Sequence, residues 1–142
     1  MQFAHEELVR QACANLIAQY AYLNDERRFE ELVEFFTEDA VLYRPSASDH
    51  GIRGRQAILE AFRKRPEDTM TFHVTSDVLI EVDSAGTARG RSRILLFSKS
   101  RSREGGMSAS DINPVVPGVF RDSFELTERG WKFSERRGTF WI

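Results

Sequence analysis

The apolar residues of this chain change their spacing partway along it, and this change limits the folds that the chain can adopt. Up to about residue 65 most of them recur every three or four positions, which is typical of helices that bury one face. From residue 71 onward they largely alternate with polar residues, which is typical of strands. The chain therefore reads helix, helix, short strand, helix and four longer strands, and this order predicts an α+β fold.

Three helices are predicted. The first is marked by apolar residues on one face, namely Leu8, Val9, Ala12, Cys13, Leu16, Ile17, Tyr20 and Leu23. After an interruption at Asn24-Asp25, a second and shorter helix is marked by Phe29, Leu32, Val33 and Phe36. The third covers 55–65 and ends before Pro66, which cannot continue a helix. Cys13 shares the buried face of the first helix, so we expect it to pack in the core.

Five strands are predicted, one short and four long. They cover 40–44, 71–82, 87–98, 119–126 and 131–141. Short turns at 83–86 and 127–130 join two pairs of them as hairpins. The polar connection 99–117 is unusually long for a compact domain, and the sequence leaves open whether it covers a pocket or joins an interface.

Composition describes an ordinary globular domain. The 142 residues are 41% hydrophobic and 30% charged, which fits one domain with a real core, spanning 1–142. A net charge of −2 argues against binding nucleic acid through its phosphates. No apolar run reaches bilayer length and no secretory signal begins the chain, so we expect a cytoplasmic protein with no membrane contact.

Five separated segments resemble a known family. They are Tyr20-Ala-Tyr-Leu-Asn-Asp25, the stretch 32–41, Gly54-Arg-Gln-Ala-Ile58, Phe72-His73-Val-Thr-Ser-Asp77 and the closing hairpin with Arg121-Asp122 and Gly130-Trp131. In this order they resemble SnoaL-like proteins of the nuclear transport factor 2-like superfamily. The resemblance implies a cone-shaped α+β barrel, in which three N-terminal helices pack in the concave face of a strongly bent, mixed and mainly antiparallel sheet. It also implies a pocket inside the cone.

Within that superfamily the chain is similar to scytalone dehydratase and its relatives, the polyketide cyclases included. The similarity implies that Asp25 and His73 act together on a substrate in one apolar pocket and that Tyr43 donates a hydrogen bond to a substrate carbonyl. Two departures argue against the same reaction on the same substrate. Asn24 stands where that enzyme has a second tyrosine, and the predicted strand 87–98 carries no second histidine.

Neutral imidazole can accept a proton near neutral pH, since free histidine titrates near ~6.5. An ionised Asp25 that accepts a hydrogen bond from one ring nitrogen of His73 would fix the tautomer and stabilise the imidazolium that forms. This chemistry suits elimination of water or a shift of a double bond. The structural alternatives are that Asp25 only caps the second helix and that His73 is a half-buried strand histidine bonded to backbone.

Further residues are candidates for substrate binding. Those at the helices and the closing hairpin are Tyr20, Asn24, Phe36, Phe62 and Trp131. The other aromatic residues, including Phe72 and Trp141, are expected to fill the core. Arg91 and Arg93 share a strand face with Leu95 and Phe97, and we consider two positions for them: a solvated or interface face, or the pocket, where one would pair with a substrate carboxylate.

Other chemistries find less support in the sequence. His5 and His50 lack metal-ligand spacing, and no nucleophile elbow or phosphate loop is present, so we expect no metal and no cofactor. The expected partners are a small apolar or aromatic metabolite and a second copy of the chain in a homodimer. Two alternatives to a lyase or isomerase remain: a binding module that only holds a hydrophobic ligand, and a structural small subunit resembling those of ring-hydroxylating dioxygenases.

Overall fold

The computed structural model describes residues 2–100 and 112–141. Its helical elements are α1 (Gln2–Asp25), α2 (Phe29–Val33), the short 3-10 turn η1 (Pro45–Ala47) and α3 (Arg55–Arg63). Its strands are β1 (Phe36–Tyr43), β2 (Gly51–Arg53), β3 (Thr69–Val82), β4 (Thr87–Ser100), β5 (Val116–Thr127) and β6 (Gly130–Phe140). All three predicted helices and all five predicted strands are present, but Phe36, which was assigned to the second helix, is the first residue of β1. The additional strand β2 has only three residues, too few for an alternating pattern to reveal it.

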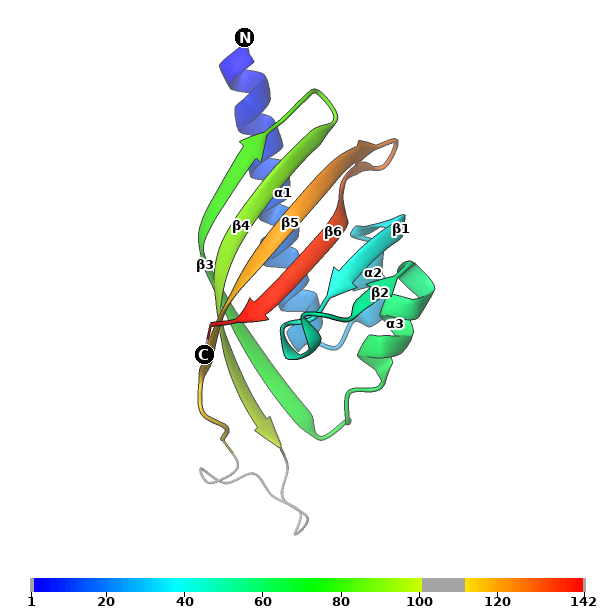
Figure 1. Cartoon of the computed structure of the whole chain (residues 1–142), viewed down its shortest axis with the longest axis vertical. Coiled ribbons are helices and arrows are strands. Elements are labelled where there is room, and N and C mark those ends of the chain that lie inside the picture. The colour runs from blue at the N-terminus through cyan, green and yellow to red at the C-terminus, as the bar shows by residue number, and fades with distance from the viewer. Residues whose placement is uncertain (1, 101–111, 142) are drawn as a thin grey trace.

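The strands form one mixed sheet in the order β2-β1-β6-β5-β4-β3. Only β1 and β6 run parallel, and every other neighbouring pair is antiparallel. The sheet is not closed, because β2 and β3 are its two edges. It curves around the helices, with α1 crossing behind the long strands in Figure 1. The predicted cone-shaped α+β architecture is confirmed.

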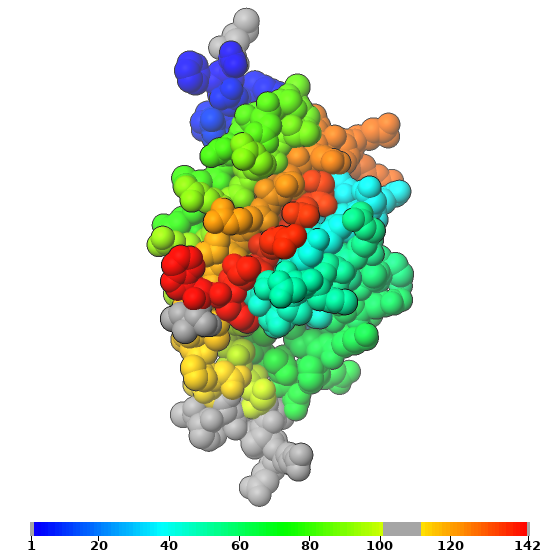
Figure 2. All heavy atoms as spheres, viewed as in Figure 1, coloured from blue at the N-terminus to red at the C-terminus, as the bar shows by residue number. Residues whose placement is uncertain are grey.

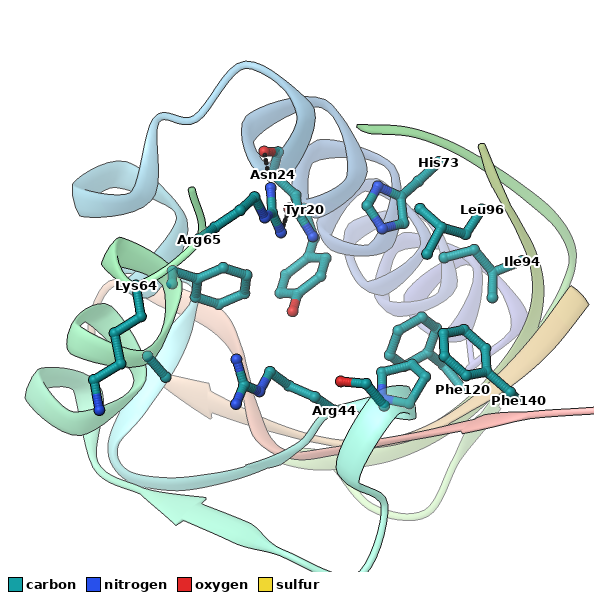
Figure 3. Close-up of a pocket in the computed structure, with 14 residues that line it drawn as sticks. Tyr20, Asn24, Arg44, Lys64, Arg65, His73, Ile94, Leu96, Phe120 and Phe140 are labelled. Carbon is teal, nitrogen blue, oxygen red and sulfur yellow. Dashed lines mark hydrogen bonds between the residues drawn. The ribbon is translucent and has the colours of Figure 1, made fainter. Parts of the chain in front are cut away.

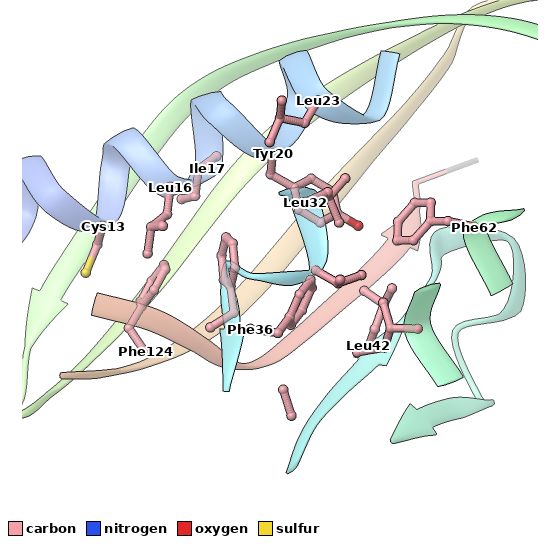
Figure 4. Close-up of a cluster of buried hydrophobic side chains, with 14 of the residues drawn as sticks. Cys13, Leu16, Ile17, Tyr20, Leu23, Leu32, Phe36, Leu42, Phe62 and Phe124 are labelled. Atoms are coloured by element: carbon pink, nitrogen blue, oxygen red, sulfur yellow. The ribbon is translucent and has the colours of Figure 1, made fainter. Parts of the chain in front are cut away.

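The core lies between α1 and the concave face of the sheet (Figure 4). The helix contributes a buried stripe at Val9, Cys13, Leu16, Ile17, Tyr20 and Leu23, whereas Leu8 is exposed. The prediction that Cys13 packs in the core is confirmed, since this thiol is fully buried. The Tyr20 ring meets the rings of Phe36, Phe62, Phe120 and Phe133 edge-on, with centroids 5.9–6.4 Å apart. Such aromatic pairs fix the C-terminal half of α1 against the sheet.

Two aromatic side chains that were predicted to lie in the core are instead exposed. In Figure 2 strands β3 to β6 make up much of the visible surface, together with β1 and β2. Phe72 is 64% exposed on β3, and Trp141 is 77% exposed just after β6, so the expectation that both fill the core is wrong. The physical reason is alternation: Thr71 and His73 occupy the inward side of β3, and Phe72 between them must point outward.

Residues 101–111 of the long polar connection lie outside the described residues. The prediction that this connection either covers a pocket or joins an interface therefore also lies outside them. Among the helices of the described residues, none is long and apolar enough to cross a membrane.

Candidate active site

A cavity of about 340 Å³ opens between the helices and the concave face of the sheet (Figure 3). Its lining comes from α1, η1, α3 and strands β3 to β6, and from residues that follow β1 and α3: Tyr20, Asn24, Arg44, Pro45, Ser46, Ala61, Phe62, Lys64, Arg65, His73, Ile94, Leu96, Phe120 and Phe140. The volume and the mixture of apolar walls with a few polar groups are those of a small-molecule site.

Asp25 and His73 are in direct contact beside this cavity. The Nδ1 atom of His73 lies 2.5 Å from Oδ1 of Asp25. The same carboxylate accepts hydrogen bonds from the backbone N–H of His73 and from the Thr71 hydroxyl, each at 2.8 Å. The side chains of His73 and Asp25 are 11% and 18% exposed, so the pair is largely shielded from water. A partly buried carboxylate with three donors holds the imidazole in one orientation.

The predicted meeting of Asp25 and His73 is therefore present, but they do not share one chamber. His73 lines the cavity, whereas Asp25 lines a separate groove of about 570 Å³ between α1 and β3. His73 borders both spaces. The carboxylate thus lies behind the imidazole, where it contacts the ring without facing a molecule in the cavity.

The structure also corrects the proposed capping role of Asp25. This residue is the last of α1, and the residue that precedes α2 is Arg28, whose side chain makes no capping hydrogen bond. Arg27 between them adopts a left-handed backbone conformation, with φ at 60°, and turns the chain between the helices. The side chain of Asp25 is bonded to β3.

Three of the predicted substrate-binding residues line the cavity: Tyr20, Asn24 and Phe62. The Tyr20 hydroxyl points into the open space in Figure 3. Burial raises the pKa of this phenol to about 12, with Asp122 adding to the effect and Arg136 opposing it. The group therefore keeps its proton at neutral pH and can donate a hydrogen bond to a molecule in the cavity.

The prediction that Tyr43 donates a hydrogen bond inside the pocket is wrong. Tyr43 does not line the cavity; its ring lies 3.7 Å beneath the guanidinium of Arg137 and packs over Gly51. On β1 the buried Ala40 and Leu42 join the core, so Tyr43 points to the opposite side of the sheet. Arg44, the next residue, faces the cavity instead.

Four other predicted binding residues lie outside the cavity. Phe36 is fully buried in the core, and Trp131 packs against that core without lining the cavity. Arg91 borders a groove with Arg121 and Glu135, away from His73. Arg93 is exposed, with its guanidinium 3.6 Å from the carboxylate of Asp77. Of the two positions considered for these arginines, the structure shows the solvated face, because Ser92, Ile94 and Leu96 occupy the inward positions of β4.

The cationic residues that line the cavity, and the buried ion pair of Arg136 with Asp122 behind its wall, were not predicted from the sequence. Arg44, Lys64 and Arg65 line the cavity, and no periodic signal marks them because they follow β1 and α3. Arg65 donates to the side-chain and backbone oxygens of Asn24, at 2.6 and 3.2 Å. Arg136 Nε lies 3.4 Å from Asp122 Oδ1, and both side chains are almost completely buried.

Arg136 is stacked among aromatic rings. Its guanidinium carbon lies 3.9 Å from the centroid of Phe120 and 4.2 Å from that of Tyr20. Burial raises the pKa of Asp122 to about 6, although the charge of Arg136 lowers it. Tyr20 and Phe120 also line the cavity. The Asp122–Arg136 pair therefore packs behind two of the rings that form the cavity wall. Across the described ranges 2–100 and 112–141, no group of three or more histidine, cysteine or carboxylate side chains could hold a metal ion.

Comparison with solved structures shows the same fold in several proteins. A proposed scytalone dehydratase from Novosphingobium aromaticivorans superposes with a TM-score of 0.82 at 22% identity, covering 99% of this chain and 89% of the other. A type 2 hexachlorocyclohexane dehydrochlorinase, LinA, gives a TM-score of 0.81 at 17% identity, with 98% and 89% covered. A variant of a Mycobacterium tuberculosis protein of unknown function gives 0.73 at 25% identity, with 94% and 76% covered.

Among curated proteins, none matches this sequence. The model of the SnoaL-like domain, in contrast, matches residues 6–137, nearly the whole chain. The helices, the sheet and the cavity described above fall almost entirely within that match. The chain therefore belongs to the SnoaL-like domain family.

Proposed function

We propose that this protein is a cofactor-independent lyase or isomerase that removes a proton from a carbon next to a carbonyl group of a small, largely apolar molecule. The observation that carries the proposal is the position of His73, which lines the cavity while its Nδ1 atom contacts the partly buried carboxylate of Asp25. This arrangement joins a base to an orienting group in a shielded site, as general-base catalysis requires.

The proposed roles follow from the contacts. With Nδ1–H donated to Asp25, the Nε2 lone pair of neutral His73 is available to accept the proton from the substrate carbon. The electron pair of that C–H bond moves toward the carbonyl oxygen, where the Tyr20 hydroxyl donates a hydrogen bond. Asp25 stabilises the imidazolium that forms. The imidazolium then returns its proton, either to a departing hydroxyl as water leaves or to another carbon in a double-bond shift.

The remaining walls define the body of the substrate. Ile94 and Leu96 of β4 with Phe120 and Phe140 form an apolar side of the cavity near His73 (Figure 3). We therefore propose a substrate with an aromatic or alicyclic ring. The names of two similar structures, a dehydratase and a dehydrochlorinase, denote eliminations and support the same reaction class.

Exchange of hydrogen for deuterium tests the proposal without knowledge of the natural substrate. Tetralone, a bicyclic aromatic ketone with acidic C–H groups beside its carbonyl, is incubated with the protein in heavy water and followed by proton NMR. We expect wild-type protein to accelerate the exchange and His73→Gln to abolish the acceleration. The control Glu26→Gln, a half-exposed carboxylate next to Asp25, should behave as wild type. Equal acceleration by His73→Gln and wild type would refute the proposal.

A further inference from the structure

The polar groups that line the cavity carry an unbalanced charge. Three of the lining residues are cationic, namely Arg44, Lys64 and Arg65, and none of the fourteen is Asp or Glu. The two carboxylates nearby are already committed, Asp25 to His73 and Asp122 to Arg136. Arg44 and Arg65 are partly buried and Lys64 is exposed. Partly buried like charges without an anion are costly, so the charge distribution favours an anionic ligand.

The three cations differ in how firmly they are held. Arg65 is fixed by its two hydrogen bonds to Asn24 and by stacking over the rings of Phe29 and Phe62, at 5.4 and 5.9 Å. Burial lowers the pKa of its guanidinium, and the like charges of Arg27 and Arg44 add to that effect. Arg65 therefore serves mainly as a rigid part of the wall and already has its partners.

Arg44 has no such partners. Its Nε atom is buried without a hydrogen bond, and within the described part of the chain it forms no ion pair. Its side chain reaches into the cavity from the wall formed by the end of β1 (Figure 3). In the same view the Tyr20 hydroxyl points from α1 into the space next to Arg44. The guanidinium of Arg44 thus lies at the cavity wall with a buried Nε that has no acceptor among the described residues, which favours an acceptor supplied by a ligand.

We propose that Arg44 binds a carboxylate of the substrate, with Lys64 adding positive charge, so that the natural substrate is a ring compound that carries a carboxylate. This inference rests on the proposed function for the reaction and deepens it by naming the substrate class. The planar guanidinium matches the two oxygens of a carboxylate. The ring would lie against Ile94, Leu96 and Phe120, with its reacting carbon toward His73.

Binding of a matched pair of probes tests the carboxylate site separately from catalysis. Naphthoate and naphthamide have nearly the same shape and differ in charge, and isothermal titration calorimetry measures their affinities without any reaction. We expect wild-type protein to prefer naphthoate by about 10- to 100-fold, as for a hydrogen-bonded charged group. Arg44→Met should lose the preference, and Arg44→Lys should keep part of it.

Arg93→Met is the matched control, because Arg93 is an arginine on the exposed face of β4, outside the cavity. It should retain the wild-type preference, and circular dichroism should show all variants folded. Equal affinities of wild type for the two probes, no naphthoate binding at millimolar concentration, or an unchanged preference in Arg44→Met would overturn the proposal. His73→Gln should keep the preference for naphthoate over naphthamide. The carboxylate site can therefore stand even if the catalytic proposal fails. The catalytic proposal can likewise stand if the carboxylate site fails.

Discussion

Nδ1 of His73 lies 2.5 Å from Oδ1 of Asp25, and this contact joins the last residue of α1 to the third strand of the sheet. Asp25 also accepts hydrogen bonds from the backbone of His73 and from Thr71. This carboxylate thus connects two residues that are 48 positions apart in the sequence and sets the direction of the imidazole. Asp25 therefore has a structural role, and in the proposed mechanism the same carboxylate also stabilises the imidazolium.

Replacement of Asp25 should therefore lower stability as well as activity. Asp25→Asn keeps the shape but offers an amide N–H₂ where one carboxylate oxygen accepts hydrogen bonds. We expect the free energy of unfolding to fall by about 1–3 kcal/mol, the cost of leaving largely buried donors unpaired. Urea denaturation measures this change. Glu26→Gln serves as control and should change the free energy of unfolding little. An equal loss in both variants would show that the hydrogen bonds of Asp25 do not stabilise the fold.

The Tyr20 hydroxyl should matter for turnover and little for folding. Tyr20→Phe removes a hydroxyl that faces the cavity and keeps the ring that packs against four phenylalanines. We expect deuterium exchange on tetralone to slow by roughly 10-fold or more, since a hydrogen bond to the carbonyl oxygen strengthens as negative charge develops there. The midpoint of urea unfolding should stay close to that of wild type. Exchange at the wild-type rate would exclude Tyr20 as the donor.

Asp122 should give the protein a pH-dependent stability. Burial raises its pKa from 3.8 to about 6 in the folded chain. Between these pH values the folded state holds a proton that the unfolded chain releases, so the contribution of Asp122 is complete below about pH 4 and is lost as the pH rises toward 6. The loss would be on the order of 2–3 kcal/mol.

Comparison with Asp122→Asn isolates this effect from other titrating groups. The variant cannot titrate at this position, so the difference in free energy of unfolding between wild type and variant should change over pH 4 to 6. Urea denaturation at several pH values measures the difference. A constant difference across this range would show that Asp122 titrates alike in the folded and unfolded chains.

A cluster of exposed apolar side chains on the convex face predicts self-association. Phe72 and Phe97 are directly opposite on β3 and β4, as are Val74 and Leu95, and all four are exposed. Contiguous apolar surface of this kind commonly marks an interface, and we expect a second copy of the chain to cover it. Analytical ultracentrifugation should show a wild-type dimer and a shift toward monomer for Phe97→Asp. The control Leu126→Asp, at an exposed leucine outside the cluster, should remain dimeric; a monomeric wild type at all concentrations would contradict the expectation.

The fold could be predicted from the sequence because its elements are long and strongly periodic. The apolar stripe of α1 and the alternation of β3 to β6 identify helices and strands without tertiary information. The boundaries differ by a few residues, as for β1, which begins at Phe36 instead of residue 40. Helix ends and strand ends depend on tertiary contacts, which local sequence does not encode.

The site could be predicted only in part, because period alone does not say which face of a strand points inward. Val41 and Leu42 are both buried, so β1 offers no polar side that would mark Tyr43 as outward and Arg44 as inward. The same ambiguity affects β4, where Ile94 and Leu96 face the cavity while Leu95 and Phe97 face outward. His73 and Asp25 were identified through the family resemblance, and their contact depends on how the end of α1 packs against β3, which local sequence does not encode.

The most direct test of the central claim, that His73 acts as a base inside the cavity, uses nitrobenzisoxazole. This small aromatic molecule opens its ring when a base removes its single reactive proton, and the coloured product reports the rate. We predict that wild-type protein accelerates the reaction and that His73→Gln lowers kcat/KM by about 10²- to 10⁴-fold. A kcat/KM of His73→Gln equal to that of wild type, in a variant that circular dichroism shows to be folded, would contradict the claim.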